Sequence, residues 1–290
     1  MSRNNELRTG AQNTSDSPAA VEAASPQEEA VSRSPLDFVT PTNFVSLPSK
    51  GKGYAESHPL YNKEVIEIKF MTAKEEDILT SRALLKKNLA IERFLQSVIL
   101  DKKINVKDML VGDRNAVLVA ARASGYGETY DSNVTCPACG EKSNLAFDLE
   151  NPKIHEGEMP PFVEVEETER GTYIMSLPAS KFSVEIRLMT GEDENYIAHM
   201  LQSSKKNNMP ENNMSEQYKR MIVSIEGYTD KKVINHFIKN GPAKDLRLIR
   251  SVYKHISPDV KVVSDFCCPS CGHEQELEVS FGADFFWPDR

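Results

Sequence analysis

Four of the five cysteines stand in two short motifs of the same form, Cys136-Pro137-Ala138-Cys139-Gly140 and Cys268-Pro269-Ser270-Cys271-Gly272. In such a C-P-x-C-G knuckle the two thiolates face one side, and the glycine lets the chain turn back tightly. One knuckle supplies only two of the four ligands that a closed tetrahedral zinc site needs. We therefore predict one structural Zn²⁺ bound by Cys136, Cys139, Cys268 and Cys271.

Two other interpretations of the cysteines stay open: reduced, buried thiol pairs without a metal, and a redox or iron–sulfur site. A redox pair normally opens a helix in a thioredoxin-like setting, and neither knuckle precedes a predicted helix. Cys267 is interpreted as a spare thiol. His273 follows the second knuckle, but Glu141 stands at the matching position of the first, so His273 is left out of the ligand set.

The 128 residues between the knuckles are explained by an internal repeat. Residues 66–72 (IEIKFMT) return as 184–190 (VEIRLMT), and the first knuckle returns as the second, in the same order. The two offsets are 118 and 132, and a polar insertion near residues 203–217 accounts for the difference. The pattern predicts a duplicated unit, each copy of which brings half of the zinc site.

Each copy has the same predicted elements. Alternating strands over 65–70 and 183–188 are followed by a threonine with an acid three residues later, which is a helix-capping signal. Helices are predicted over about 73–87, 89–100 and 113–124 in the first copy and 191–203, 215–226, 231–239 and 243–256 in the second. A hairpin closes each copy. The predicted fold is α+β, with two tandem duplicated strand-helices-hairpin units joined by a shared four-cysteine, zinc-ribbon-like site.

We predict four segments along the chain. Residues 1–36 are rich in Ser, Pro and Ala and form a disordered tail, because they offer too little apolar surface to offset chain entropy. Residues 37–150 form the first repeat and residues 171–290 the second. Residues 151–170, which hold two proline sites and six glutamates, form an acidic linker.

Charge and motif content exclude several classes of protein. The chain has 35 Lys and Arg against 43 Asp and Glu, a net charge of −8, which is the wrong sign for a protein that mainly neutralises phosphates. No HExxH, GxSxG, GxGxxG or P-loop motif occurs, so nothing nominates a catalytic residue. The N-terminus lacks a secretory signal, and no apolar run reaches 18 residues. We predict a soluble protein that is not an enzyme.

The C-terminal end gathers aromatic residues, Phe285-Phe286-Trp287-Pro288, around the only tryptophan. Such an apolar terminus either packs over the chain's own core or anchors a partner. The sequence leaves both interpretations open.

Three blocks of sequence and this terminus resemble the baseplate hub proteins of T4-type contractile-tailed phages. They are 47–51 (LPSKG), 71–80 (MTAKEEDILT) and 111–116 (VGDRNA), together with the first knuckle and 284–288 (DFFWP). The resemblance covers about residues 43–290 and leaves the tail outside. The 71–80 and 111–116 blocks are more specific than C-P-x-C-G, which many zinc proteins share.

The resemblance implies a non-enzymatic structural or assembly protein of the baseplate hub. Its expected partners are other hub or tail proteins, without a small-molecule substrate, nucleic acid or membrane. Its expected location is the virion tail baseplate, or the host cytoplasm during assembly. The alternatives are a zinc-ribbon adaptor that binds nucleic acid or a polymerase, which rests on C-P-x-C-G alone, and a redox enzyme that uses the CxxC pairs.

Overall fold

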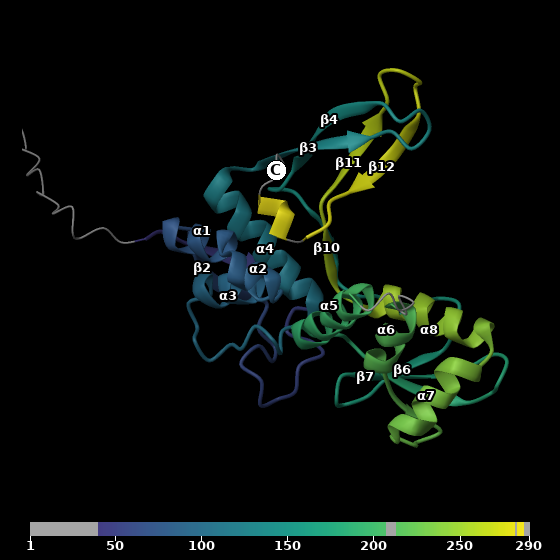
Figure 1. Cartoon of the computed structure of the whole chain (residues 1–290). Helices are drawn as coiled ribbons and strands as arrows, with labels where there is room; N and C mark the ends of the chain where they lie inside the picture. The colour runs from purple at the N-terminus through teal and green to yellow at the C-terminus, as the bar shows by residue number, and fades with distance from the viewer. Residues whose placement is uncertain (1–39, 207–212, 282, 287–290) are drawn as a thin grey trace, which may run out of the picture. The chain divides into compact units, whose positions relative to one another are not determined.

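The structure is a computed structural model that describes residues 40–206, 213–281 and 283–286 (Figure 1). The tail predicted over 1–36 lies outside these residues. The helices are α1 (Ala73–Thr80), α2 (Arg82–Lys86), α3 (Ala90–Val98), α4 (Val111–Tyr126), α5 (Gly191–Lys206), α6 (Asn213–Met221), α7 (Lys231–Asn240), α8 (Ala243–Ile256) and a final 3-10 turn, η1 (Ala283–Phe286).

The strands form five antiparallel sheets among the described residues. They are β1 (Thr42–Ser46), β2 (Val65–Lys69), β3 (Thr129–Thr135), β4 (Lys142–Asp148), β5 (Lys153–His155), β6 (Val165–Glu167), β7 (Thr172–Ser176), β8 (Ser183–Arg187), β9 (Ile222–Ile225), β10 (Asp259–Lys261), β11 (Val263–Cys267) and β12 (Glu274–Glu278). The order β6-β7-β8-β9 makes the largest sheet, and β1–β2, β3–β4, β11–β12 and β5–β10 are two-stranded. The mixed helix and sheet content agrees with the α+β prediction.

Two predicted helices differ from the structure. The helix over 73–87 is broken into α1 and α2, because Ser81 adopts an extended conformation. The helix over 215–226 ends at Met221, and the β-branched run that follows forms β9 along the edge of β8. Such residues favour a half-buried strand when a neighbouring edge is open.

The segment predicted as an acidic linker contains two short strands. β5 pairs with β10, and β6 joins the edge of β7. The buried core runs without interruption from Ile68 and Phe94 to Ile186 and Ile249. The division of this body into two repeats therefore stays a prediction at this point.

The aromatic end packs against the chain's own core. Phe285 and Phe286 are buried. The Phe286 ring meets Phe94 of α3 edge-on, with 4.9 Å between ring centroids, and Phe285 lies 5.1 Å from Tyr130 of β3. The Arg122 Nε–H of α4 donates to the Phe285 carbonyl at 2.8 Å. These two residues therefore act as a strap over the core, while Trp287 lies outside the described residues.

Candidate metal centre

The two knuckles lie at the tips of the β3–β4 and β11–β12 hairpins, which run side by side with their tips at the same end (Figure 1). In the first knuckle the Cys136 amide donates to the Glu141 carbonyl at 2.8 Å, and the Gly140 amide donates to the Cys136 carbonyl at 2.9 Å. Gly140 has a φ of 77°, a left-handed conformation that a side chain would strain.

The second knuckle repeats this geometry. The Cys268 amide donates to the His273 carbonyl and the Gly272 amide to the Cys268 carbonyl, both at 2.9 Å. Gly272 has a φ of 69°. Two turns of the same conformation therefore present two thiols each.

The structure brings the four predicted cysteines together. The Sγ atoms of Cys136 and Cys271 are 3.7 Å apart, and those of Cys139 and Cys268 are 3.6 Å apart. All four sulfur atoms lie within 4.8 Å of one another. A tetrahedron with zinc–sulfur bonds of about 2.3 Å has sulfur–sulfur edges of about 3.8 Å. The site could therefore bind a metal ion without a large rearrangement.

An apolar layer lies on one side of this site. Cys136 and Cys268 are buried, whereas Cys139 and Cys271 are exposed. The side chains around the buried sulfurs are Phe266, Val134, Leu145 and Leu277, contributed by all four strands of the two hairpins. These contacts hold the two hairpins together, so the positions of the ligands do not depend on the knuckles alone.

The Cys268 and Cys139 thiols differ in their acidity. The backbone amides of Cys271 and Ser270 lower the pKa of the Cys268 thiol to about 7. At Cys139 the Glu141 amide lowers the pKa, but the neighbouring Cys271 and Cys268 sulfurs outweigh it and raise the pKa to about 12. Four thiolates this close repel one another, and a bound dication would offset that repulsion.

The two residues that the sequence left out of the ligand set lie outside the cluster. The His273 ring faces Gln275, with 3.2 Å between Nε2 and Oε1. Cys267 is exposed and is the only described cysteine that is not in the cluster.

Sequence reasoning missed a set of buried contacts at the start of α4, in the block 111–116. Asp113 is buried and accepts hydrogen bonds from the Ser49 amide (3.0 Å), the Ser49 hydroxyl (2.6 Å) and the Tyr54 hydroxyl (2.6 Å). Burial raises the pKa of Asp113, although Ser49 and Tyr54 act in the opposite direction. This carboxylate thus fixes the block 47–51 against α4.

The next residues of the same block contact the second half of the chain. Arg114 Nη1 donates to Glu194 Oε2 of α5 at 2.6 Å, and Asn115 Nδ2 donates to Asp259 Oδ1 of β10 at 2.9 Å. Gly112 lies against Pro258, where an added Cβ would be 2.0 Å from the carbonyl oxygen. The block therefore serves to pack the two halves together, a long-range role that no local pattern predicts.

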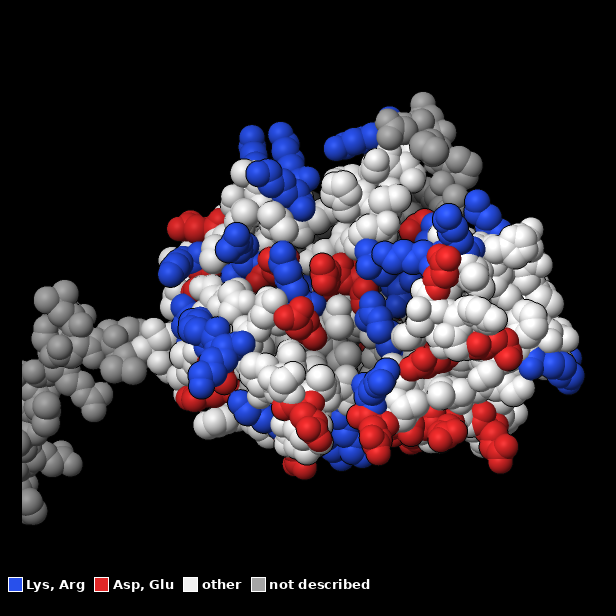
Figure 2. Space-filling model, turned by 90° about the horizontal axis from the view of Figure 1, so that it is seen from below, with Lys and Arg blue, Asp and Glu red and all other residues white. Residues whose placement is uncertain are grey.

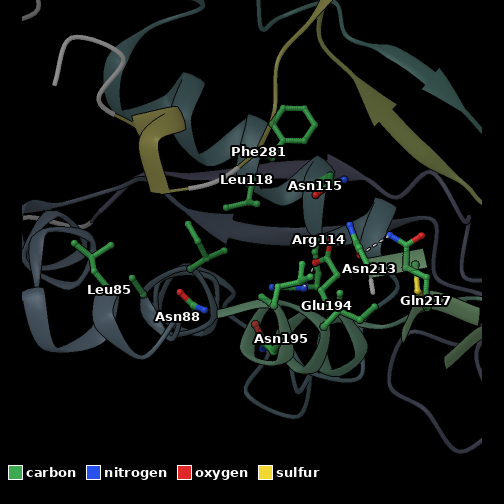
Figure 3. A pocket seen from close by; sticks show the side chains of 16 residues that line it. Leu85, Asn88, Arg114, Asn115, Leu118, Glu194, Asn195, Asn213, Gln217 and Phe281 are labelled. Atoms are coloured by element: carbon green, nitrogen blue, oxygen red, sulfur yellow. Dashed lines mark hydrogen bonds and ion pairs between the residues drawn. The ribbon is translucent and has the colours of Figure 1, made fainter. Parts of the chain in front are cut away.

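A cavity of about 450 Å³ lies beside these contacts, between α3, α4, α5 and α6 (Figure 3). The Arg114–Glu194 ion pair forms part of its wall. The residues that line it include no Cys, His, Ser, Thr or Lys. Its one carboxylate, that of Glu194, is paired with Arg114, so this part of the described chain offers no evident nucleophile or proton-transfer pair.

Surface charge does not form a single basic patch on the face drawn in Figure 2, where Lys and Arg side chains are interspersed with Asp and Glu. Nucleic-acid binding usually requires basic side chains gathered on one face. Within the described residues, no helix has the length and apolarity that crossing a membrane requires.

Comparison with protein families gives a match over most of the chain. The family model described as T4 bacteriophage base plate protein matches residues 40–287 of the chain. This range includes both knuckles and leaves the Ser/Pro-rich tail outside. No curated protein and no solved structure matches the chain.

Proposed function

The chain belongs to the T4 bacteriophage base plate protein family, and we propose that it is a non-enzymatic structural or assembly protein of the baseplate hub, rigidified by one Zn²⁺. The expected partners are other hub or tail proteins. The zinc proposal rests on one observation: the sulfur atoms of four cysteines approach one another at nearly tetrahedral spacing. These are Cys136, Cys139, Cys268 and Cys271.

The two halves of the chain are proposed to be copies of one unit, and their first hairpins support this. β1 (TNFVS) and β7 (TYIMS) are each followed by Leu-Pro. β1 pairs with β2 in the same register as β7 pairs with β8: Thr42 lies opposite Lys69, and Thr172 opposite Arg187. The agreement continues through every residue of both pairs.

A buried carboxylate at the start of the next helix follows each hairpin, at the same distance along the sequence in both halves. Glu75 of α1 accepts from Lys69 Nζ at 2.7 Å and from the Thr72 amide at 3.1 Å, and it also contacts the Thr72 hydroxyl. The ion pair and the cap together hold the strand to the start of the helix.

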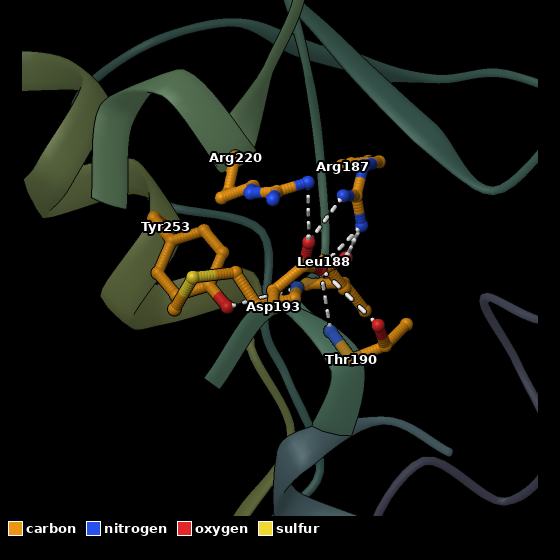
Figure 4. Close-up of polar contacts among 7 residues, drawn as sticks. Arg187, Leu188, Thr190, Asp193, Arg220 and Tyr253 are labelled. Atoms are coloured by element: carbon orange, nitrogen blue, oxygen red, sulfur yellow. Dashed lines mark hydrogen bonds and ion pairs between the residues drawn. The ribbon is translucent and has the colours of Figure 1, made fainter. Parts of the chain in front are cut away.

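The second half has the same arrangement (Figure 4). Asp193 of α5 accepts two hydrogen bonds from the Arg187 guanidinium, both at 2.8 Å, and one from the Thr190 amide at 3.0 Å. Arg220 lies 3.8 Å from the same carboxylate. Arg187 and Asp193 thus form the same ion pair between strand and helix that Lys69 and Glu75 form in the first half.

A second pair of carboxylates also corresponds. Asp113 and Asp245 are each the third residue of a helix, α4 and α8, and both are buried. Asp245 accepts from the amides of Ala179 and Ser180, at 2.8 and 2.9 Å, in the loop after β7. Asp113 binds Ser49 in the loop after β1. These pairs support a duplication that extends from the first strand to the last hairpin.

The proposed duplication gives the zinc a mechanical role. Each copy ends in a hairpin that supplies two thiolates, so one ion would connect the ends of both copies. Structural zinc in small peptides binds with about 10–16 kcal/mol, comparable to the stability of a whole domain. A small junction protein would gain stiffness in this way without a large interface.

The carboxylate in the first copy gives a testable prediction. Burial alone would raise the pKa of Glu75, but Lys69, Ser97 and Thr72 together lower it from 4.5 to about 2. Its contribution to stability is therefore fully present above about pH 5 and is lost as the pH falls towards 2. We expect Glu75→Gln to destabilise the chain by about 2 kcal/mol at pH 7, and by progressively less towards pH 2, in urea unfolding.

The control for this variant is Asp77→Asn on the same helix, since Asp77 is exposed. Its effect is expected to stay within about 0.5 kcal/mol at every pH. Equal losses for the two variants, or a Glu75→Gln loss that does not depend on pH, would contradict the role assigned to Glu75.

The proposed function is tested by mass spectrometry of purified virions and of baseplate hub intermediates. A fixed stoichiometry of this chain in either preparation is expected, and its presence in the virion or only in the intermediate separates a structural from an assembly role. Absence from both would contradict the proposal. Salt-sensitive binding of DNA or RNA by the purified chain would instead favour the zinc-ribbon adaptor.

A further inference from the structure

The two halves differ at one edge of their first sheet. β7 lies between β8 and β6. Its counterpart β1 pairs with β2 alone among the described residues, and Phe44 in its middle has 69% of its surface exposed. An unpaired edge with an exposed aromatic residue is a template for another strand.

The hydrogen bonds around β1 identify which groups face this open edge. The Pro41 carbonyl accepts from the Phe70 amide at 2.9 Å, and the Leu47 amide donates to the Glu64 carbonyl at 2.7 Å. Because bonding alternates along an antiparallel pair, residues 42, 44 and 46 point their amides away from β2. The Phe44 amide donates instead to the adjacent Asn43 side chain at 2.8 Å.

The other side of this hairpin is already covered. Ile99 forms a bridge with Ile68, and the Leu100 amide donates to the Glu67 carbonyl at 3.2 Å. This segment occupies the place that β9 takes beside β8. The strand without a described counterpart in the first half is therefore β6.

The residue just before β1 differs from the one just before β7. β6 reaches β7 through a turn in which Gly171 has a φ of 71° and the Thr168 amide donates to the Thr172 carbonyl. When β1 is aligned with β7, Pro41 stands at the position of Gly171. A proline ring fixes φ near −65°. Pro41 therefore cannot adopt the positive φ that Gly171 has in the turn between β6 and β7.

We propose that the outer edge of β1 (Thr42–Ser46) receives an extended strand of another baseplate protein, antiparallel as β6 is to β7. This inference rests on the duplication proposed above. The pattern of β6 indicates the chemistry of the strand. In β6 and the two residues before it, Val163 and Val165 pack against the core, and Glu164 and Glu166 are exposed. A partner segment with β-branched apolar residues alternating with polar ones fits the same edge.

Amide hydrogen exchange tests the proposal on hubs or hub intermediates that contain the chain. In the free chain the amides of residues 42, 44 and 46 are expected to exchange rapidly. In the assembled complex they are expected to be protected at least 10-fold.

Phe44→Pro removes one outward amide, which an edge strand tolerates. It is expected to lower incorporation at least 10-fold while the free chain keeps its circular dichroism spectrum and zinc content.

The matched control compares Tyr228→Lys with Phe44→Lys, since both aromatic side chains are exposed to a similar degree, 65% and 69%. Only Phe44→Lys should impair incorporation. Protection of the β1 amides in the free chain, by its own tail or by a second copy, would overturn the proposal. So would unchanged exchange in a complex that contains the chain. Absence of the wild-type chain from every complex would instead contradict the proposed function.

Discussion

Removal of the proposed zinc ion by a strong chelator is expected to loosen the β3–β4 and β11–β12 hairpins in one transition. Each knuckle supplies two of the four thiolates, so neither hairpin keeps a complete ligand set when the ion leaves. Elemental analysis of the purified chain should give one zinc per chain, and amide exchange should accelerate in both hairpins together.

Single substitution sharpens the same expectation. Cys139→Ser changes a proposed ligand on the first knuckle, yet it should disturb the second hairpin as much as the first, because both hairpins contribute to the proposed site. The expected loss of stability is several kcal/mol, a part of the binding free energy that a structural zinc contributes. Cys267→Ser is the matched control, since Cys267 is exposed and lies outside the cluster; zinc content and stability should stay unchanged.

Two results would contradict the shared site. The first is two zinc ions per chain, which would require further ligands for each knuckle. The second is a Cys139→Ser chain in which β11–β12 keeps its metal and its native amide protection. Reversible cycling between dithiol and disulfide in the metal-free chain would instead favour the redox interpretation of the cysteines.

The cysteine cluster can be predicted from the sequence, because the residues that shape each half of it lie within one short motif. The proline and the glycine of each C-P-x-C-G motif predict a tight turn. Because the motif occurs twice, the second cysteine pair is the natural candidate to complete the four ligands that the first pair begins. The start of α1 can be predicted for the same reason. Thr72 and Glu75 lie three residues apart, and the Thr72 amide and hydroxyl hydrogen-bond to the Glu75 carboxylate.

The remaining features depend on contacts between distant residues. Asp113 appears in the sequence only as an acid near a predicted helix, and its role follows from Ser49 and Tyr54, more than 50 residues away. The sequence predicts a helix over the residues of β9, because the pairing of β9 with β8 is not encoded within its own four residues. Short edge strands depend on whether a neighbour is present, and so are the least predictable elements.

The second large effect is expected at the C-terminus. A chain that ends at residue 282 lacks Phe285 and Phe286, two buried rings, and the hydrogen bond from Arg122 to the Phe285 carbonyl. Removing one buried phenylalanine side chain typically costs about 3–5 kcal/mol. We expect a total loss of at least 5 kcal/mol, or a fall in Tm of roughly 10–20 °C for a protein of this size.

A chain that ends at Phe286 is the matched control, because it keeps both rings and lacks only residues 287–290. It is expected to unfold close to the wild-type midpoint in urea. Hub incorporation of this chain then tests the other interpretation of the aromatic end: normal folding with failed incorporation would assign a partner contact to residues 287–290, which include Trp287. Wild-type stability in the chain that ends at residue 282 would show that Phe285 and Phe286 do not strap the core, despite their burial against Phe94 and Tyr130.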